Sequence, residues 1–131
     1  MQLVPTILEQ TPQAVIDQVN KLSPYFSTFQ IDVVDGIFAP NKTPSVKDLL
    51  PVIDLVLPET KQQTIFDFHL MTADYEKEID HIKALSNKIT VRNILVHSDL
   101  SPNYHLLAME CPKFTFGAVL NSEDNVYEVM K

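Results

Sequence analysis

Short apolar runs alternate with amphipathic stretches along the chain. Runs with the two-residue period of strands lie at 3–8, 29–34, 64–71, 89–97 and 114–120. Stretches with a helical period or capping residues follow them, at 12–22, 45–55, 74–85, 101–109 and 122–131. Repeated strand–helix units form parallel strands joined by right-handed crossovers. The pattern therefore predicts an α/β fold with five strand–helix units.

Composition limits the class of protein. With 131 residues, 45% of them hydrophobic, the chain is expected to form one domain, residues 1–131, with its own core. A net charge of -7 argues against nucleic acid and acidic membrane surfaces as partners. No apolar run reaches the ~20 residues of a membrane span, and the N-terminus lacks a signal-peptide pattern. With one cysteine, Cys111, these features favour a cytoplasmic protein.

Polar residues interrupt the strands, although buried parallel strands normally read as apolar runs. Gln30 and Asp32 share one face of the second predicted strand, His69 lies on the third and His97 on the fourth. Functional sites of α/β proteins lie at the carboxyl ends of their strands. We therefore expect Asp32, His69 and His97 to meet at that edge. Such a set can share a divalent metal or act as a proton-transfer pair.

Several segments resemble the ribulose-phosphate 3-epimerase family. The sequence QIDVVDGIFAPN, residues 30–41, resembles the signature H-x-D-x-M-D-G-x-F-V-P-N. PTIL at 5–8 is similar to the family's P-S-I-L, and DFHLM at 67–71 to its D-x-H-L-M strand. HSD at 97–99 resembles its H-x-E strand, and FGAVL at 116–120 its fifth strand. The matches come in the family's order and span the chain.

The resemblance implies a ribulose-phosphate-binding TIM barrel, a (β/α)₈ fold of which this chain covers about five of eight units. A single partial or open barrel is therefore expected over residues 1–131. The implied activity is that of an isomerase, a carbohydrate epimerase that converts D-ribulose 5-phosphate to D-xylulose 5-phosphate. It works by proton transfer at C3 through an enediolate, assisted by a divalent metal ion such as zinc, iron(II) or manganese.

The resemblance also implies roles for individual residues. Asp32 would be a catalytic acid/base and a metal ligand, and His69 a metal ligand that contacts the substrate. Gln30 stands where the family has a histidine ligand, and an amide is a poor ligand for zinc-like metals. The other implied substrate contacts are Thr6, Met71, Asn41 and His97.

Other interpretations stay open. The family's second catalytic aspartate and its phosphate loops lie on later strands, so we expect this chain alone to show no turnover. Five strands cannot close an eight-stranded barrel, and the open edges favour a homo-oligomer. Five units could also form an open, doubly wound sheet that serves as a non-catalytic binding or assembly module. A third interpretation is an epimerase for another ketose phosphate.

Overall fold

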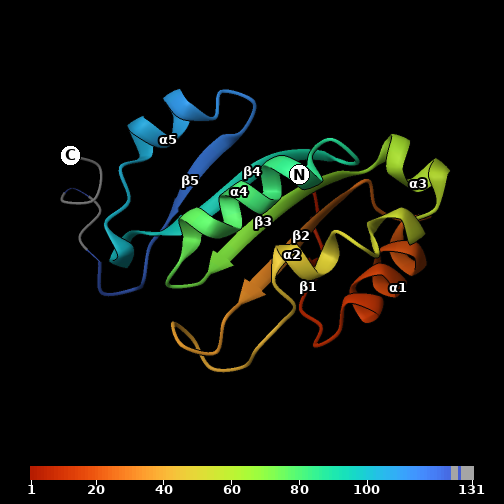
Figure 1. The fold of residues 1–131 in the computed structure, drawn as a ribbon, viewed down its shortest axis with the longest axis horizontal. Coiled ribbons are helices and arrows are strands. Elements are labelled where there is room, and N and C mark those ends of the chain that lie inside the picture. The colour runs from red at the N-terminus through yellow and green to blue at the C-terminus, as the bar shows by residue number, and fades with distance from the viewer. Residues whose placement is uncertain (125–126, 128–131) are drawn as a thin grey trace.

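The computed structural model describes residues 1–124 and residue 127, and it contains one all-parallel sheet with the strand order β1-β2-β3-β4-β5 (Figure 1). The strands are β1 (Thr6–Ile7), β2 (Thr28–Val34), β3 (Ile65–Met71), β4 (Thr90–His97) and β5 (Thr115–Val119). The helices are α1 (Pro12–Leu22), α2 (Val46–Leu49), α3 (Pro58–Gln63), α4 (Tyr75–Leu85) and α5 (Tyr104–Glu110), with 3₁₀ turns η1 (Ile53–Leu55) and η2 (Ser98–Leu100).

Over residues 1–124 and 127, the hydrophobic core lies on one face of the sheet. Alternate strand residues such as Ile31, Phe68 and Ile94 form one buried cluster with Val19 of α1 and Ile82 of α4. Figure 1 shows α2 and α4 in front of the central strands. We call the opposite side of the sheet the open face. A doubly wound sheet has helices on both faces and reverses its strand order, so this arrangement is not doubly wound. It is compatible with part of a (β/α) barrel.

Local sequence explains the two longest helices, and both match the predicted ranges. The Thr11 side chain accepts a hydrogen bond from the backbone N–H of Ala14, and Pro12 occupies the first turn of α1. At α4, the Asp74 side chain accepts a hydrogen bond from the Lys77 backbone N–H in the same way. Each helix begins where a side chain satisfies an otherwise free N–H.

The prediction of one helix over residues 45–55 is wrong. Ser45 and Asp48 form a capping box that starts α2, but α2 ends at Leu49. Pro51 lacks an N–H and cannot continue a helix. The chain forms η1 instead, and then α3, which begins at Pro58 and which the sequence pattern did not indicate.

Two further boundaries differ from the predictions. The first strand is two residues long instead of six, because β1 has β2 as its one neighbour and Pro5 offers no N–H. The helix expected from Ser101 begins at Tyr104, where Asn103 is the cap, because Ser101 has a left-handed backbone with φ +50°. The helix expected at 122–131 lies mostly outside the described residues.

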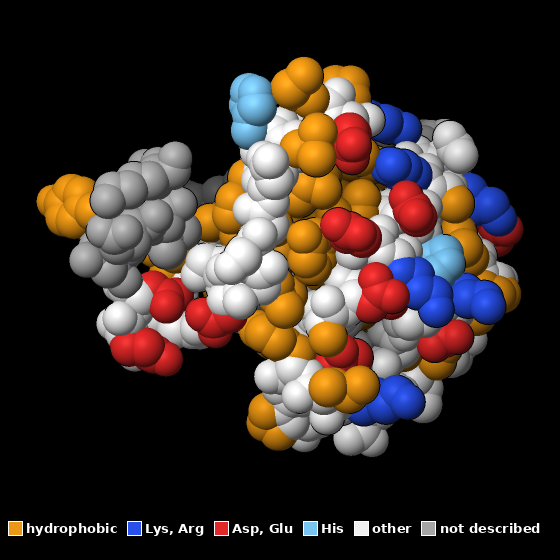
Figure 2. All heavy atoms as spheres, turned by 60° about the vertical axis from the view of Figure 1, so that its left-hand side comes forward, with side chains coloured by type: hydrophobic (Ala, Val, Ile, Leu, Met, Phe, Trp, Pro, Cys, Tyr) orange, Lys and Arg blue, Asp and Glu red, His pale blue; other side chains and the backbone are white. Residues whose placement is uncertain are grey.

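In the part of the chain that the structure describes, β1 and β5 are the edge strands of the sheet, each with one neighbouring strand. Hydrophobic side chains gather on the surface around the β5 end of the molecule (Figure 2), where Leu106, Met109 and Leu120 are exposed. Edges and apolar surface of this kind favour association, and the homo-oligomer stays a prediction. Among the described residues, no helix combines the length and apolarity needed to span a bilayer.

Candidate active site

Four polar side chains form a continuous row across the open face. The Gln30 Nε2 atom lies 3.0 Å from Asp32 Oδ1, and His69 Nδ1 lies 3.3 Å from the same oxygen. On the far side of His69, its Nε2 lies 2.9 Å from His97 Nε2. Asp32, His69 and His97 thus meet, as their positions on successive strands predict.

Strand register explains why the row forms. Asp32 of β2 is paired directly with His69 of β3, and His69 is paired with Leu95 of β4. His97 lies two residues beyond Leu95 and so is the diagonal neighbour of His69 on the same face. These positions lie in the carboxyl-terminal halves of their strands, where α/β sites are found.

The hydrogen bonds of the row fix a consistent set of donors and acceptors. Asp32 Oδ1 accepts from Gln30 Nε2–H, and His69 Nδ1 lies within ion-pair distance of the same oxygen, so the proton of His69 is placed on Nδ1, beside the carboxylate. A neutral His69 then has a bare Nε2, which accepts from His97 Nε2–H. Both contacts of Asp32 use Oδ1, so Oδ2 keeps its lone pairs for a substrate proton. The side chain of Asp32 is 11% exposed and that of His69 is 17% exposed.

His97 is the buried end of the row, next to His69. It is buried, and its ring lies 4.9 Å from that of Phe38, centroid to centroid. Burial, and then the neighbouring His69, lower the pKa of His97, while Asp99 and Asp124 oppose the shift. The low pKa favours the neutral ring that the hydrogen-bond pattern requires.

Phe38 belongs to the loop after β2, and Asp35 holds that loop in place. Asp35 Oδ1 accepts from the backbone N–H groups of Ile37 and Phe38, each at 2.8 Å. Its Oδ2 accepts from Ala73 N–H, at 2.9 Å, in the loop after β3. Sequence reasoning did not assign Asp35 or Phe38 a role. An aspartate followed by glycine at a strand end was a usable signal, since it favours a turn of this kind.

The other predicted substrate contacts lie at varying distances from the row. Thr6 is exposed on β1 and is paired with Gln30, so it borders the row. Met71 follows His69 by two residues on the open face and is partly buried. Asn41 is exposed in the loop with φ +74°, and no hydrogen bond joins it to the row in the described part of the chain. The structure thus gives Asn41 a turn-forming position.

The predicted metal residues do not offer converging donor atoms. Gln30 directs its amide N–H at Asp32, and both ring nitrogens of His69 already have partners. Across residues 1–124 and 127, no three His, Cys, Asp or Glu side chains are grouped to hold a metal ion. Because Gln30 and His69 turn these atoms to other side chains, the donor set in this arrangement does not fit zinc, iron(II) or manganese.

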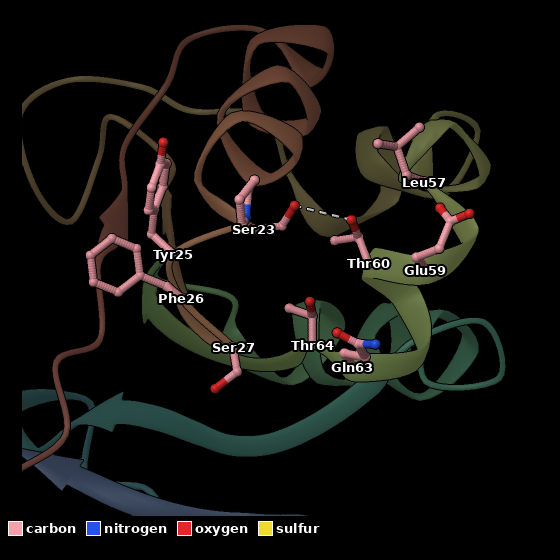
Figure 3. Close-up of a pocket in the computed structure, with 10 residues that line it drawn as sticks. Ser23, Tyr25, Phe26, Ser27, Leu57, Glu59, Thr60, Gln63 and Thr64 are labelled. Carbon is pink, nitrogen blue, oxygen red and sulfur yellow. Dashed lines mark hydrogen bonds between the residues drawn. The ribbon is translucent and has the colours of Figure 1, made fainter.

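A cavity of about 510 Å³ lies elsewhere, at the amino-terminal edge of the sheet (Figure 3). Ser27 and Thr64, which directly precede β2 and β3, line it together with Thr60 of α3. Its one hydrogen bond between lining side chains joins Thr60 to Ser23 at 3.1 Å. The row lies toward the other ends of the strands, so this cavity is separate from it.

No protein-family model matches the chain, and a search of curated proteins finds no significant relative. The resemblance to ribulose-phosphate 3-epimerases therefore depends on the motifs and on where the fold places them.

Proposed function

We propose that the open face of this chain carries the proton-transfer site of an isomerase similar to ribulose-phosphate 3-epimerase, on a barrel-type β/α scaffold. The observation that carries the proposal is the contact of His69 Nδ1 with Asp32 Oδ1, at 3.3 Å, at the carboxyl end of the sheet. The motif resemblance independently assigns acid/base and ligand roles to these two residues.

Asp32 is the proposed base. A proton on a carbon next to a ketone is weakly acidic, so its removal needs a positioned base and stabilisation of the resulting oxyanion. Asp32 Oδ2 takes the proton from C3 of the ketopentose phosphate, the C–H electron pair forms the C2–C3 double bond, and the π pair of the C2 carbonyl moves onto its oxygen to give the enediolate. His69 and Gln30 hold the carboxylate through Oδ1. Return of the proton to C3 regenerates the ketone.

Return of a proton to the opposite face of C3 would complete the epimerisation. The resemblance assigns that step to a second aspartate on a later strand. The proposal for the present residues is therefore the first half of the reaction, which exchanges the C3 proton with solvent and does not by itself invert the carbon.

Proton exchange at C3 tests the proposal. D-ribulose 5-phosphate is incubated with the protein in D₂O, and loss of the C3 proton signal is followed by NMR. We expect exchange with little epimer, and a loss of about 10²–10⁴-fold in Asp32→Asn. Asp80→Asn, an exposed change on α4, is the matched control and should keep the rate. Equal background rates in the wild type and in Asp32→Asn would favour the non-catalytic module.

The same assay addresses the choice of substrate. Other ketopentose and ketohexose phosphates, run in parallel, would show whether a related ketose phosphate exchanges faster than ribulose 5-phosphate. A faster competitor would favour the third interpretation of the sequence.

A further inference from the structure

Gln30 acts as a hydrogen-bond donor in the row. Its Nε2–H points at Asp32 Oδ1, an oxygen that also lies 3.3 Å from His69 Nδ1. A glutamine that ligates a metal would present its carbonyl oxygen instead, because the amide nitrogen has no free lone pair. In this arrangement Gln30 donates a hydrogen bond to Asp32 Oδ1. If Gln30 were a metal ligand, that oxygen would stay available to the metal ion.

His97 occupies the other side of His69. The 2.9 Å distance between the two Nε2 atoms requires that one of them donates and the other accepts. Because His69 Nδ1 lies 3.3 Å from the Asp32 carboxylate and carries the His69 proton there, the donor is His97 Nε2–H. Both nitrogens of His69 are then in use. The remaining His97 Nδ1 is buried with no hydrogen-bond partner among the described residues. A bare acceptor there is less costly than an unpaired N–H, which agrees with this tautomer.

Packing keeps His97 in this orientation. Its ring is stacked on His69, with centroids 5.0 Å apart and 21° between planes, and is covered by Phe38. Rotation of the ring away from His69 would require Phe38 to move. Asp35 holds the loop that carries Phe38 at two of its backbone N–H groups and ties it to Ala73 N–H in the loop after β3.

We infer that His97 is a positioning residue which, together with Gln30, makes Asp32 and His69 a proton-transfer pair that works without a divalent metal. This inference rests on the proposed function. It departs from the metal-assisted chemistry that the resemblance implies, and two residues account for the departure. Gln30 supplies a donor in place of an imidazole ligand, and His97 occupies the nitrogen that His69 would offer to a metal.

Metal affinity tests the inference without reference to activity. Zn²⁺ is titrated into the EDTA-treated protein by calorimetry, in the wild type, Asp32→Ala, Gln30→His and His97→Phe. The wild type should bind no more tightly than Asp32→Ala. Gln30→His should gain about tenfold or more in affinity, because it restores an imidazole beside Asp32. One equivalent of Zn²⁺ bound by the wild type and lost in Asp32→Ala would overturn the inference.

Two substitutions of His97 separate positioning from simple packing. His97→Phe keeps a ring against Phe38 but frees His69 Nε2, so Zn²⁺ affinity should rise above that of the wild type. His97→Gln can still donate an amide N–H to His69, and its affinity should stay at the wild-type level. Equal affinities in Phe and Gln variants that both keep the native circular dichroism spectrum would contradict the positioning role.

The C3 exchange assay then distinguishes the inference from the proposed function. Exchange that EDTA leaves unchanged supports both. Exchange that appears only with added Zn²⁺ or Mn²⁺ overturns the inference and keeps the function. No exchange in a protein that binds no metal counts against the proposed function alone, because the metal titration has then met its own expectation.

Discussion

Asp67 and Arg92 form a two-point ion pair across β3 and β4. Arg92 Nε lies 3.1 Å from Asp67 Oδ1, and Nη2 lies 2.6 Å from Oδ2. Asp67 Oδ1 also accepts from the Asn93 backbone N–H at 3.0 Å. The pair sits where the β3–β4 register shifts between Phe66 and Phe68. The buried Asp67 carboxylate thus accepts from a backbone N–H that the irregular β3–β4 ladder leaves without a partner in β3. Its hydrogen bonds to Arg92 also raise the pKa of that side chain.

This pair should contribute measurably to stability. We expect Arg92→Ala to lower the free energy of unfolding by about 1–3 kcal/mol, because it leaves the carboxylate of Asp67 buried without the two N–H donors of Arg92. A double-mutant cycle with Asp67→Ala, followed by urea unfolding, should give a coupling energy of about 0.5–3 kcal/mol. The exposed Lys83–Asp80 pair of α4, at 3.4 Å, is the control and should couple by less than about 1 kcal/mol. Similar couplings in both pairs would contradict the assigned role.

Sequence periodicity could predict the strands because each carries a strong two-residue pattern against one core. It also placed Asp32, His69 and His97 together, since parallel strands in register bring alternate positions to one face. It could not predict the partners within the row. Whether His69 faces a metal or His97 depends on side-chain rotation and on the packing of Phe38. These are contacts between strand and loop that no periodicity encodes.

The helical segment after Ser45 shows where apolar spacing gave a wrong prediction. The capping signal at Ser45 was correct, but apolar spacing continued past Pro51 and suggested one long helix. Proline geometry overrides spacing, so the chain turns and starts again at Pro58. Local backbone chemistry decided the boundary there.

The two glycines should respond differently to alanine. Gly36 has φ +78°, a conformation that costs an L-residue about 1–2 kcal/mol. A Cβ there would also lie 3.3 Å from the Asn41 carbonyl oxygen. At Gly117 the obstacle is the Leu95 Cδ2 atom, at 2.7 Å, which is the end of a flexible side chain. We expect Gly36→Ala to lower the free energy of unfolding by about 1–2 kcal/mol. Gly117→Ala should lower it by less.

A second background checks this explanation. In Leu95→Ala the obstacle to a Cβ at position 117 is gone, so adding Gly117→Ala should be neutral or stabilising, because alanine restricts the unfolded chain. The penalty at Gly36 should persist in that background. A penalty at Gly117 that survives removal of Leu95 would mean that the backbone, and not the leucine, resists the side chain.

Asp35 should make the stability of the loop depend on acid pH. Burial raises the pKa of Asp35, but its bonds to the backbone N–H groups of Ala73, Phe38 and Ile37 outweigh burial, and the net pKa is lowered from 3.8. A carboxyl group with a lowered pKa in the folded state stabilises above its unfolded value and loses that contribution as the pH falls below it. Asp35→Asn should therefore cost about 1–3 kcal/mol at pH 7, and the difference from wild type should shrink toward pH 3. A constant difference between pH 7 and pH 3 would contradict the ionic role.

Glu78 should show the reverse dependence. This buried side chain of α4 accepts from the Val46 N–H at 2.9 Å, yet burial outweighs that bond and raises the pKa of the carboxyl above 4.5. The folded state then binds a proton more readily than the unfolded chain, so the contribution to stability is complete below pH 4.5 and decreases as the pH rises through the folded value.

Glu78→Gln keeps an acceptor for Val46, and its amide borders a cavity of about 280 Å³ where water can bind. We expect Glu78→Gln to raise the free energy of unfolding at pH 7 by roughly 1 kcal/mol, and the gain to vanish near pH 4. Glu76→Gln, on the exposed side of the same helix, should show no comparable gain at pH 7. A gain in Glu78→Gln that is equal at both pH values would show that ionisation of the carboxyl is not the cause.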